Sequence, residues 1–265
     1  MSIRRFTRFS YVFVAVSAAL SCAACESKEA TASVETKVSV DAKTVFSDKG
    51  AAQLADAASS GDAAKVDKLV KAGANPSAIG DKATSVVQFA MLNKSKAGVE
   101  ALLNAGADPM HADDNGDTLM HYAAKSADPG YMDILLAHKA DVNVQNTVTS
   151  ATPLIAALFG EREPQFHKLL AAGANPNIAD RGGNTALHIA AKINENQLSL
   201  DLLKAGADPL AKNKQGVTFQ RYLNMTPTRL LTEDAKRQRE AIVTWLRDHN
   251  IPVEAPPAPP APAQH

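Results

Sequence analysis

A six-residue phrase recurs four times in this chain, and its spacing limits what the chain can fold into. The copies read KAGANP, NAGADP, AAGANP and KAGADP, and they begin at Lys71, Asn104, Ala171 and Lys204. Successive glycines of these copies are 33, 67 and 33 residues apart, so the middle interval holds two periods plus one residue. A fixed period of this length indicates a stack of similar units, each of which buries its apolar face against its neighbours.

A second recurring phrase, about ten residues long, lies between these copies. It reads GDTLMHYAAK from Gly116, ATPLIAALFG from Ala151 and GNTALHIAAK from Gly183. These segments resemble the G-x-T-P-L-H-x-A-A phrase of ankyrin repeats, and the match extends over most of a domain that we place at residues 47–253. The resemblance implies an all-α ankyrin-repeat solenoid of about six helix-turn-helix repeats with short hairpin turns. By register the repeats fall at residues 50–80, 81–113, 114–146, 147–180, 181–213 and 214–253.

Each part of the two phrases has a physical function in such a repeat. Thr118, Thr152 and Thr185 lie where a side-chain oxygen can cap the first helix. Leucine pairs, as in LDLLKAGADP, give the second helix its apolar face, and the glycine that follows adopts the left-handed conformation cheaply. The Asx-Pro pair then turns the chain away from the helix. The six-residue phrase is therefore a helix stop with no chemistry of its own.

Three places depart from this pattern. Lys139 stands where the other repeats have glycine, and a non-glycine residue in the left-handed conformation costs on the order of 1 kcal/mol, so we expect a weaker or distorted helix end. The loop at residues 146–151 contains no glycine and carries the extra residue of the long interval. The last repeat places its apolar pair near Leu246, about ten residues late, which a short extra helix starting at Thr226 would absorb.

The two ends of the chain differ in composition from the repeats. Three arginines precede an apolar stretch that is too short to span a bilayer, which predicts a secretory signal at residues 1–24. Cys25, or alternatively Cys22, follows small residues in a pattern that resembles a bacterial lipobox, where the thiol is acylated after cleavage. Residues 25–46 are typical of a flexible tether, and residues 254–265 form a Pro-rich tail that favours extended geometry.

These end segments predict the location of the protein. Acylation at Cys25 would leave no free cysteine thiol in the mature chain, which suits an oxidising compartment. We expect a protein of the periplasm of a Gram-negative bacterium, attached to a membrane only through an N-terminal lipid anchor. The alternative, ordinary cleavage between small residues, would give a soluble periplasmic protein.

The repeats contain no pattern of residues that predicts catalysis. The 28 basic and 28 acidic side chains cancel, so no broad positive field attracts nucleic acid. The ankyrin resemblance gives His121 and His188 structural hydrogen bonds to loop backbone. The other histidines of the repeats have neither metal-site nor nucleophile–base spacing, and the acidic run at residues 113–117 lacks the last glutamate of a calcium loop. We expect no enzyme activity, no metal and no cofactor.

The resemblance leaves the surface as the candidate site. In ankyrin proteins the hairpin tips and the ends of the first helices line a concave face that commonly binds another protein. Phe159 and Ile193 are the expected apolar anchors, while acidic tips near residue 114 and basic tips near residues 181 and 214 predict a partner of opposite polarity along its length. The positions carried over by register are Asp114, Asn115, Asp117, Lys125, Ser126, Val148, Thr149, Ala151, Phe159, Arg181, Gly182, Asn184, Lys192, Ile193, Lys214, Gln215, Val217 and Met225.

Three classes of function follow from these expectations. The first is a non-enzymatic, monomeric protein that binds a protein partner. Small exported ankyrin proteins of this kind resemble the immunity proteins encoded beside secreted antibacterial effectors, notably type VI secretion lipases, and such a protein would act by occluding the toxin. The second is a periplasmic scaffold that supports oxidative-stress defence, for example by assisting a catalase. The third is an enzyme, which the absence of a reactive constellation disfavours, and we expect the first.

Overall fold

The computed structural model describes residues 41–255, and every regular element within them is helical. One isolated bridge pairs Ile79 with Ser85. The predicted all-α solenoid is therefore confirmed, while Cys22, Cys25 and the predicted signal lie outside the described residues. The helices, pair by pair, are α1 (Lys49–Ser60) and α2 (Ala63–Lys71), α3 (Val86–Leu92) and α4 (Lys96–Asn104), α5 (Leu119–Lys125) and α6 (Gly130–Ala137), α7 (Pro153–Phe159) and α8 (Glu163–Ala171), α9 (Ala186–Lys192) and α10 (Asn196–Lys204), and α11 (Phe219–Leu223) and α12 (Glu233–Asp248).

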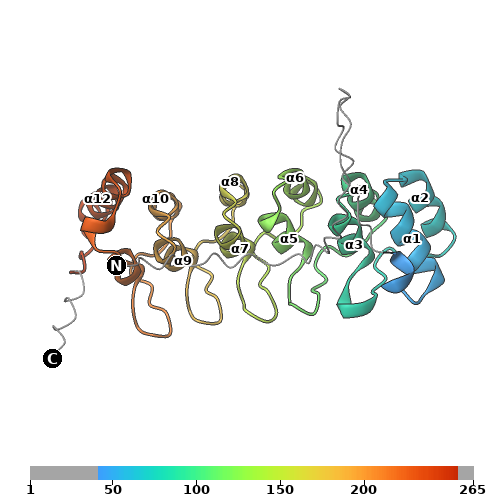
Figure 1. Cartoon of the computed structure of the whole chain (residues 1–265), viewed down its shortest axis with the longest axis horizontal. Helices are drawn as coiled ribbons and strands as arrows, with labels where there is room; N and C mark the ends of the chain where they lie inside the picture. Colours follow the sequence, from blue (N-terminus) through green and yellow to red (C-terminus); the bar gives the residue numbers. More distant parts are fainter. Residues whose placement is uncertain (1–40, 256–265) are drawn as a thin grey trace, which may run out of the picture. The chain divides into compact units, whose positions relative to one another are not determined.

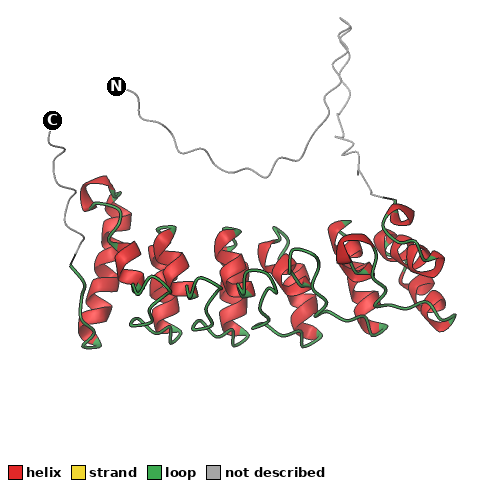
Figure 2. Cartoon of the chain, turned by 90° about the horizontal axis from the view of Figure 1, so that it is seen from below, coloured by secondary structure: helices red, strands yellow, loops and turns green. Residues whose placement is uncertain are grey.

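The two helices of each pair occupy two layers in this part of the chain (Figure 1). The first helices form one layer, with the hairpin loops extending beyond it, and the second helices form the other. Figure 2 shows the same pairs stacked one after another. First helices pack on one another from pair to pair, for example α5 on α7 and α9 on α11. The largest fully buried side chains are Phe166, Phe219, Leu54, Leu102, Leu119, Met120, Met132, Leu135, Leu154, Ile155, Leu158 and Leu169.

Polar side chains begin the first helices as the sequence predicts. Ser85 Oγ accepts a hydrogen bond from the backbone N–H of Gln88 at 3.2 Å, at the start of α3. Thr152 Oγ1 accepts from the N–H of Ile155 at 3.4 Å, at the start of α7. These oxygens satisfy N–H groups that have no partner within the helix, and this fixes where each first helix begins.

Backbone hydrogen bonds join the hairpin loops of successive repeats. The N–H of Arg181 donates to Thr149 O at 2.8 Å, and the N–H of Lys214 donates to Gly182 O at 3.0 Å. The loop at residues 146–151 has the predicted extra residue, because Asn146 N–H reaches five residues ahead to Ala151 O at 2.8 Å. The hairpin tips are therefore held in a ladder, and the longer loop keeps its place in it.

The helix end at Lys139 shows no distortion. Lys139 adopts φ +56°, its N–H donates to Leu136 O at 3.0 Å, and the N–H of Ala140 donates to Leu135 O at 3.0 Å. The equivalent N–H groups at the Gly106 end donate at 3.0 and 2.9 Å. Lys139 therefore ends the helix with the same hydrogen bonds as glycine. The only difference is the backbone strain of a residue with a Cβ in the left-handed conformation.

Replacing this lysine should stabilise the protein. We expect Lys139→Gly to raise the free energy of unfolding by about 0.5–1 kcal/mol, because relief of the left-handed strain exceeds the extra entropy that glycine gives the unfolded chain. Urea denaturation at constant m-value measures this difference. The opposite variant, Gly106→Ala, should lower the stability by a similar amount, since a Cβ there meets nothing within 4 Å and φ is +87°. Unchanged midpoints in both variants would contradict the strain argument.

The folded part begins earlier than the sequence predicts. The tether was expected to extend to residue 46, but η1 (Ala42–Thr44) is a short 3-10 helix within that range. Ala42 and Phe46 are 0% and 2% exposed, and the Phe46 ring lies edge-on to Phe89, with 5.5 Å between centroids. Residues 41–46 thus belong to the folded part, because η1 packs against α1 and the Phe46 ring packs against Phe89 of α3.

The last repeat contains the predicted extra helix. It is the 3-10 helix η3 (Thr228–Leu230), which follows Pro227 and precedes the 16-residue helix α12. Leu246, the displaced apolar residue, is fully buried on α12. The insertion therefore lengthens the turn between the two helices, and α12 packs against α10 of the preceding repeat.

The C-terminal boundary of the repeats also needs correction, because Glu254 belongs to the folded part and not to the Pro-rich tail. Its carboxylate accepts from Thr218 Oγ1 at 2.6 Å, and its N–H donates to Gln220 Oε1 at 2.9 Å. Gln220 Nε2 donates in turn to Pro252 O at 3.0 Å. This segment thus forms hydrogen bonds with the polar groups at the start of α11, in the place where the hairpin of a further repeat would bond to them.

Candidate functional site

The predicted binding residues lie in the hairpin tips and at the ends of the first helices, a surface that we call the hairpin face. Phe159, at the end of α7, is 61% exposed, and Val148, at a hairpin tip, is 46% exposed. Ile193 differs from the expectation of a second projecting anchor, because it is half-buried and packs against the core. The hairpin face comprises the tips at residues 113–117, 146–151, 180–184 and 213–217 and the C-terminal ends of α3, α5, α7, α9 and α11.

One position of this face recurs in every repeat and forms a row. Its apolar members are exposed by 58% at Leu92, 61% at Phe159 and 61% at Met225, and they alternate with two lysines. The sequence analysis missed Leu92, although the 33-residue register that placed Phe159 also finds it. We call this set the first-helix row, and its members are Ser59, Leu92, Lys125, Phe159, Lys192 and Met225.

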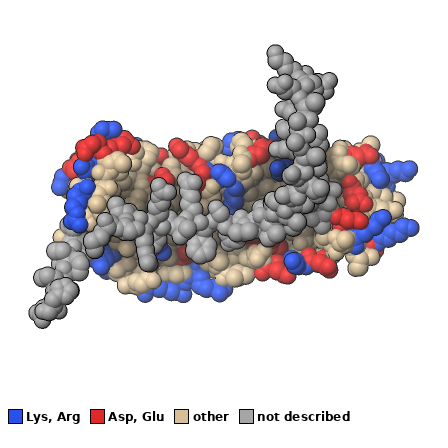
Figure 3. Space-filling view, in the orientation of Figure 1, with Lys and Arg blue, Asp and Glu red and all other residues tan. Residues whose placement is uncertain are grey.

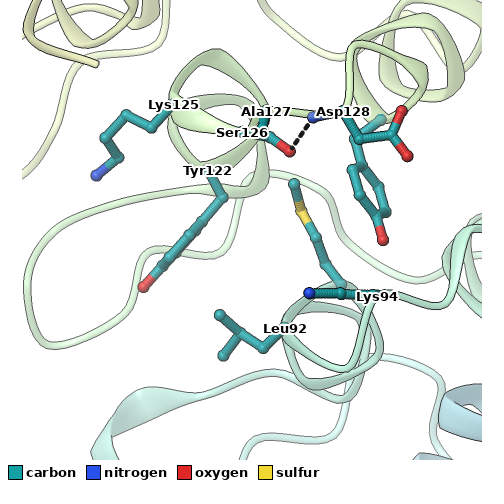
Figure 4. Close-up of a pocket in the computed structure, with 9 residues that line it drawn as sticks. Leu92, Lys94, Tyr122, Lys125, Ser126, Ala127 and Asp128 are labelled. Carbon is teal, nitrogen blue, oxygen red and sulfur yellow. Dashed lines mark hydrogen bonds between the residues drawn. The ribbon is translucent and has the colours of Figure 1, made fainter. Parts of the chain in front are cut away.

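A pocket of about 470 Å³ opens beside the row between the second and third repeats (Figure 4). Leu92 and Lys94 of the second repeat lie on one side of it, and Tyr122, Lys125 and Ser126 of the third repeat lie on the other. The sequence reasoning did not identify this pocket, because its walls come from two repeats. The lining residues are Met91, Leu92, Lys94, Tyr122, Lys125, Ser126, Ala127, Asp128 and Tyr131.

The acidic tip of the third repeat uses two of its three carboxylates within the protein. Asp117 forms an ion pair with Lys125, and Asp113 accepts a hydrogen bond from the Tyr122 hydroxyl at 2.5 Å. Burial, together with this hydrogen bond, raises the pKa of Tyr122, so the phenol keeps its proton and continues to donate. Asp114 is exposed and makes no side-chain hydrogen bond within the described residues. Most of the charge predicted at this tip is therefore already paired.

The basic side chains of the fifth and sixth repeats are free by comparison. Arg181, Lys192 and Lys214 are exposed, and within residues 41–255 no carboxylate oxygen lies within 4.0 Å of their nitrogens. Lys192 Nζ lies 5.9 Å from the centre of the Tyr222 ring, which orients the ammonium without neutralising it. Figure 3 shows basic side chains gathered along the lower edge beneath α9 and α10, and acidic ones nearer the middle.

The two histidines of the repeated phrase have the structural function that the resemblance implies. His121 Nδ1 accepts from the N–H of Thr118 at 3.2 Å, so the ring proton is on Nε2, which donates to Ala151 O at 3.0 Å. His188 repeats this arrangement with Thr185 and the next hairpin, where its Nε2 lies 3.2 Å from Val217 O. Burial lowers the pKa of both histidines, and neither is open to a ligand.

These histidines should make the protein sensitive to acid. Their folded-state pKa lies below the ordinary 6.5, so the unfolded chain binds protons first as the pH falls below about 6.5. The contribution of the two neutral histidines to the free energy of unfolding should be fully present above that pH. As the pH falls further, the free energy of unfolding should decrease by up to about 1.4 kcal/mol per pH unit for each histidine, until the pH is below the lowered pKa. Urea midpoints between pH 7.5 and 5 measure the effect.

The second repeat provides the matched control for this pH dependence. Gln88 occupies the histidine position there, accepts from Ser85 N–H at 2.8 Å and donates to Asp117 O at 3.2 Å. The double variant His121→Gln/His188→Gln should therefore keep its stability at pH 7.5 and lose most of the acid sensitivity. A double variant as acid-sensitive as the parent would show that other groups control the titration.

Other ligand-binding groups are dispersed in the described part. His111 Nε2 lies 2.8 Å from Ala83 O, and His249 stacks on Trp245 at 3.9 Å between ring centres. His167 lies 3.5 Å from a carboxylate oxygen of Glu163. Within residues 41–255 no three His, Cys, Asp or Glu side chains gather as metal ligands would. None of the helices described is both long and apolar enough to cross a membrane.

Comparison with known families decides the classification of the chain. The model for ankyrin repeats in three copies matches residues 54–146 and 128–213, which together are more than half of the 265 residues. The chain belongs to the ankyrin repeat family. Ankyrin folds are typically non-enzymatic interaction modules, and they generally bind protein partners.

Curated relatives match part of this ankyrin chain. Protein PhlB of Serratia liquefaciens is 48% identical over 115 residues, which are 43% of this chain and 51% of PhlB. Putative ankyrin repeat protein L92 of Acanthamoeba polyphaga mimivirus is 44% identical over 80 residues, which are 29% of this chain and 19% of L92. The chain thus spans about half or less of the length of these relatives.

Solved ankyrin structures match a larger share of this chain than the curated relatives do. The ankyrin repeat domain of Bcl-3, described as a unique member of the IkappaB protein family, has a TM-score of 0.60 and 27% identity, and the match covers 69% of this chain and 81% of that one. The ankyrin repeat protein EF0377 has a TM-score of 0.61 and 20% identity, and the match covers 72% of this chain and 96% of that one. The second likeness supports the fold alone.

Proposed function

We propose that this ankyrin protein binds a protein partner on the hairpin face and acts by occlusion. The observation that carries the proposal is Phe159, which is 61% exposed in a chain that buries Phe46, Phe166 and Phe219 almost completely. Transferring such a side chain into a partner's pocket contributes about 1.5–3 kcal/mol. The hydrogen-bonded ladder of hairpin tips holds the surrounding surface in place, so little ordering is needed on binding.

More specifically, we propose that the chain is an exported immunity protein and that its partner is a secreted antibacterial effector, such as a type VI secretion lipase. The support is the signal-like N-terminus with Cys25, and the resemblance to small exported ankyrin proteins of this kind. A lipid anchor in the periplasm would raise the concentration of the protein where a lipase attacks. The bound protein would cover the active site of the effector or its approach to the membrane.

Site-specific crosslinking in cells tests the binding surface. A photo-reactive residue at Phe159 should form a covalent adduct with one defined partner, which mass spectrometry identifies. The same residue at Lys204, exposed at the end of α10 in the other helix layer, should form no such adduct. Equal labelling at both positions, or at neither, would contradict the proposed surface. If a deletion strain survives exposure to the captured effector as well as the parent does, the immunity role is wrong.

Labelling with a fatty-acid analogue tests the proposed anchor. Cys25→Ala should abolish incorporation of the label and release the protein from the membrane fraction, whereas Cys22→Ala should retain both. Labelling lost only in Cys22→Ala would assign the anchor to the alternative cysteine, and an unlabelled parent would exclude lipidation.

A further inference from the structure

Repeats four to six present two exposed apolar side chains with a free cation between them. Phe159 and Met225 are each 61% exposed and occupy the first-helix row two repeats apart. Lys192 stands between them in the row, and no carboxylate among residues 41–255 pairs with it. The nearby tips add Arg181 and Lys214, which are likewise exposed and unpaired within this range.

The other half of the row differs because its charges are already paired. Lys125, the equivalent of Lys192, forms an ion pair with Asp117 and lies 5.3 Å from the centre of the Tyr122 ring. An incoming carboxylate would have to displace Asp117 to reach this lysine, and an incoming cation would have to displace Lys125 from Asp117. The sequence predicts two complementary charged halves, whereas the side-chain contacts leave the basic half with more free charge.

The carboxylates near the basic half, among residues 41–255, do not neutralise its cations. Asp180 accepts from the N–H of Asn184 at 2.8 Å and from its side-chain amide at 3.2 Å, so it stabilises its own hairpin. Glu161 lies in the turn that joins α7 to α8 and Glu195 in the turn that joins α9 to α10, and within residues 41–255 neither forms an ion pair. Arg181, Lys192 and Lys214 therefore keep their charges available to a partner.

We propose that repeats four to six of the hairpin face bind an acidic protein segment in which a carboxylate is flanked by two apolar side chains. This inference rests on the proposed function and specifies the chemistry of the partner. The carboxylate pairs with Lys192, the apolar side chains pack on Phe159 and Met225, and further acidic residues face Arg181 and Lys214. Complementary charge speeds association and selects among partners, while the two apolar contacts slow dissociation.

The repeat spacing sets the spacing of these groups in the partner. Packed helices lie about 10 Å apart, so one repeat corresponds to about three residues of an extended polyproline II chain, which has three residues per turn, or about seven of an α-helix. The segment should therefore place its carboxylate three residues from each apolar side chain if it adopts polyproline II geometry, and seven residues if it is helical.

Synthetic peptides of both spacings test the inference on the purified protein. Each carries Phe, Glu and Leu at the stated spacing, and a matched version carries Lys in place of Glu. Fluorescence anisotropy at low ionic strength should show that the Glu peptide of one spacing binds at least tenfold more tightly than its Lys version. Lys192→Glu should reverse this preference, and Phe159→Ser or Met225→Ser should weaken binding of the Glu peptide about tenfold.

Equivalent variants in the other half are the controls. Leu92→Ser removes an apolar side chain of equal exposure, and Lys125→Glu reverses the lysine that is already paired, so both should leave peptide affinity within about twofold. Equal affinity for Glu and Lys peptides, or a loss in Leu92→Ser as large as in Phe159→Ser, would overturn the inference. If crosslinking at Phe159 captures a partner but the peptides show no charge preference, the binding function stands and the acidic chemistry is wrong. If the peptides bind with the expected charge preference but crosslinking at Phe159 captures no partner, the acidic chemistry stands and the proposed binding function in the cell is wrong.

Discussion

Gly98→Ala should lower the free energy of unfolding by about 3 kcal/mol. A Cβ at Gly98 would lie 1.8 Å from the carbonyl oxygen of Ala58 and 2.5 Å from its carbonyl carbon. Both contacts are with backbone atoms, so no rotamer change relieves them, and α4 has to move away from α1. The bond from Ser95 Oγ to Ala58 O, 2.6 Å long, would be lost with that movement. Urea denaturation gives the loss.

Gly106→Ala is the matched control for this contact. Gly106 follows the end of the same helix, but a Cβ there meets nothing within 4 Å. Gly106→Ala should therefore lower the free energy of unfolding only by the left-handed backbone strain, about 1 kcal/mol. The equivalent positions of later repeats hold Tyr131 and Leu198, which shows that the repeat itself does not require glycine. Equal losses in the two glycine variants would mean that α4 yields freely and that the close approach to α1 contributes little.

Asn146→Ala should lower the free energy of unfolding by about 2–4 kcal/mol. The Asn146 side chain is 5% exposed and joins two hairpins. Its Nδ2 donates to Asn115 O at 3.0 Å and to Asp117 Oδ1 at 2.8 Å, and its Oδ1 accepts from the N–H groups of Val148 and Thr149 at 2.8 and 2.7 Å. Alanine removes all four hydrogen bonds and with them the side-chain link between the two hairpins.

Thr147→Ala tests whether this loss comes from the buried amide or from any change in the loop. Thr147 is the next residue, is exposed, and makes no side-chain hydrogen bond within the described part of the chain. Its replacement should change stability by less than about 0.5 kcal/mol. In hydrogen exchange, Asn146→Ala should reduce the protection of the Thr149 N–H, and Thr147→Ala should not. Equal stability of the two variants would show that the asparagine bridge is dispensable.

Several features follow from local chemistry, and the sequence predicts them. The threonine that caps α7, the left-handed glycines after the second helices and the short helix η3 depend on residues close to one another in the chain. The structural histidines are also predictable, because the Nε2 of His121 donates to a backbone carbonyl of the next hairpin, Ala151 O, and this hairpin recurs in every repeat. The same register could have identified Leu92 as a member of the first-helix row.

Other features were decided only by the positions of side chains and backbone in the folded structure. Ile193 is half-buried because the core extends to the end of α9, and Lys125 loses its free charge because a carboxylate eight residues away in its own hairpin reaches it. Lys139 was expected to give a weaker or distorted helix end, but it adopts the left-handed conformation with the same local hydrogen bonds as a glycine helix end.

The sequence by itself determined the period, the helices and the family of this protein, because helix starts and stops depend on contacts within a few residues. The tertiary structure decided which side chains of the repeated surface are free. Burial and ion pairing depend on atoms contributed by adjacent hairpins and helices, and these leave Phe159, Lys192 and Met225 exposed while Lys125 and Asp117 satisfy each other. It also decided that Glu254 belongs to the folded part, since that residue bonds to the start of α11, 36 positions earlier in the chain.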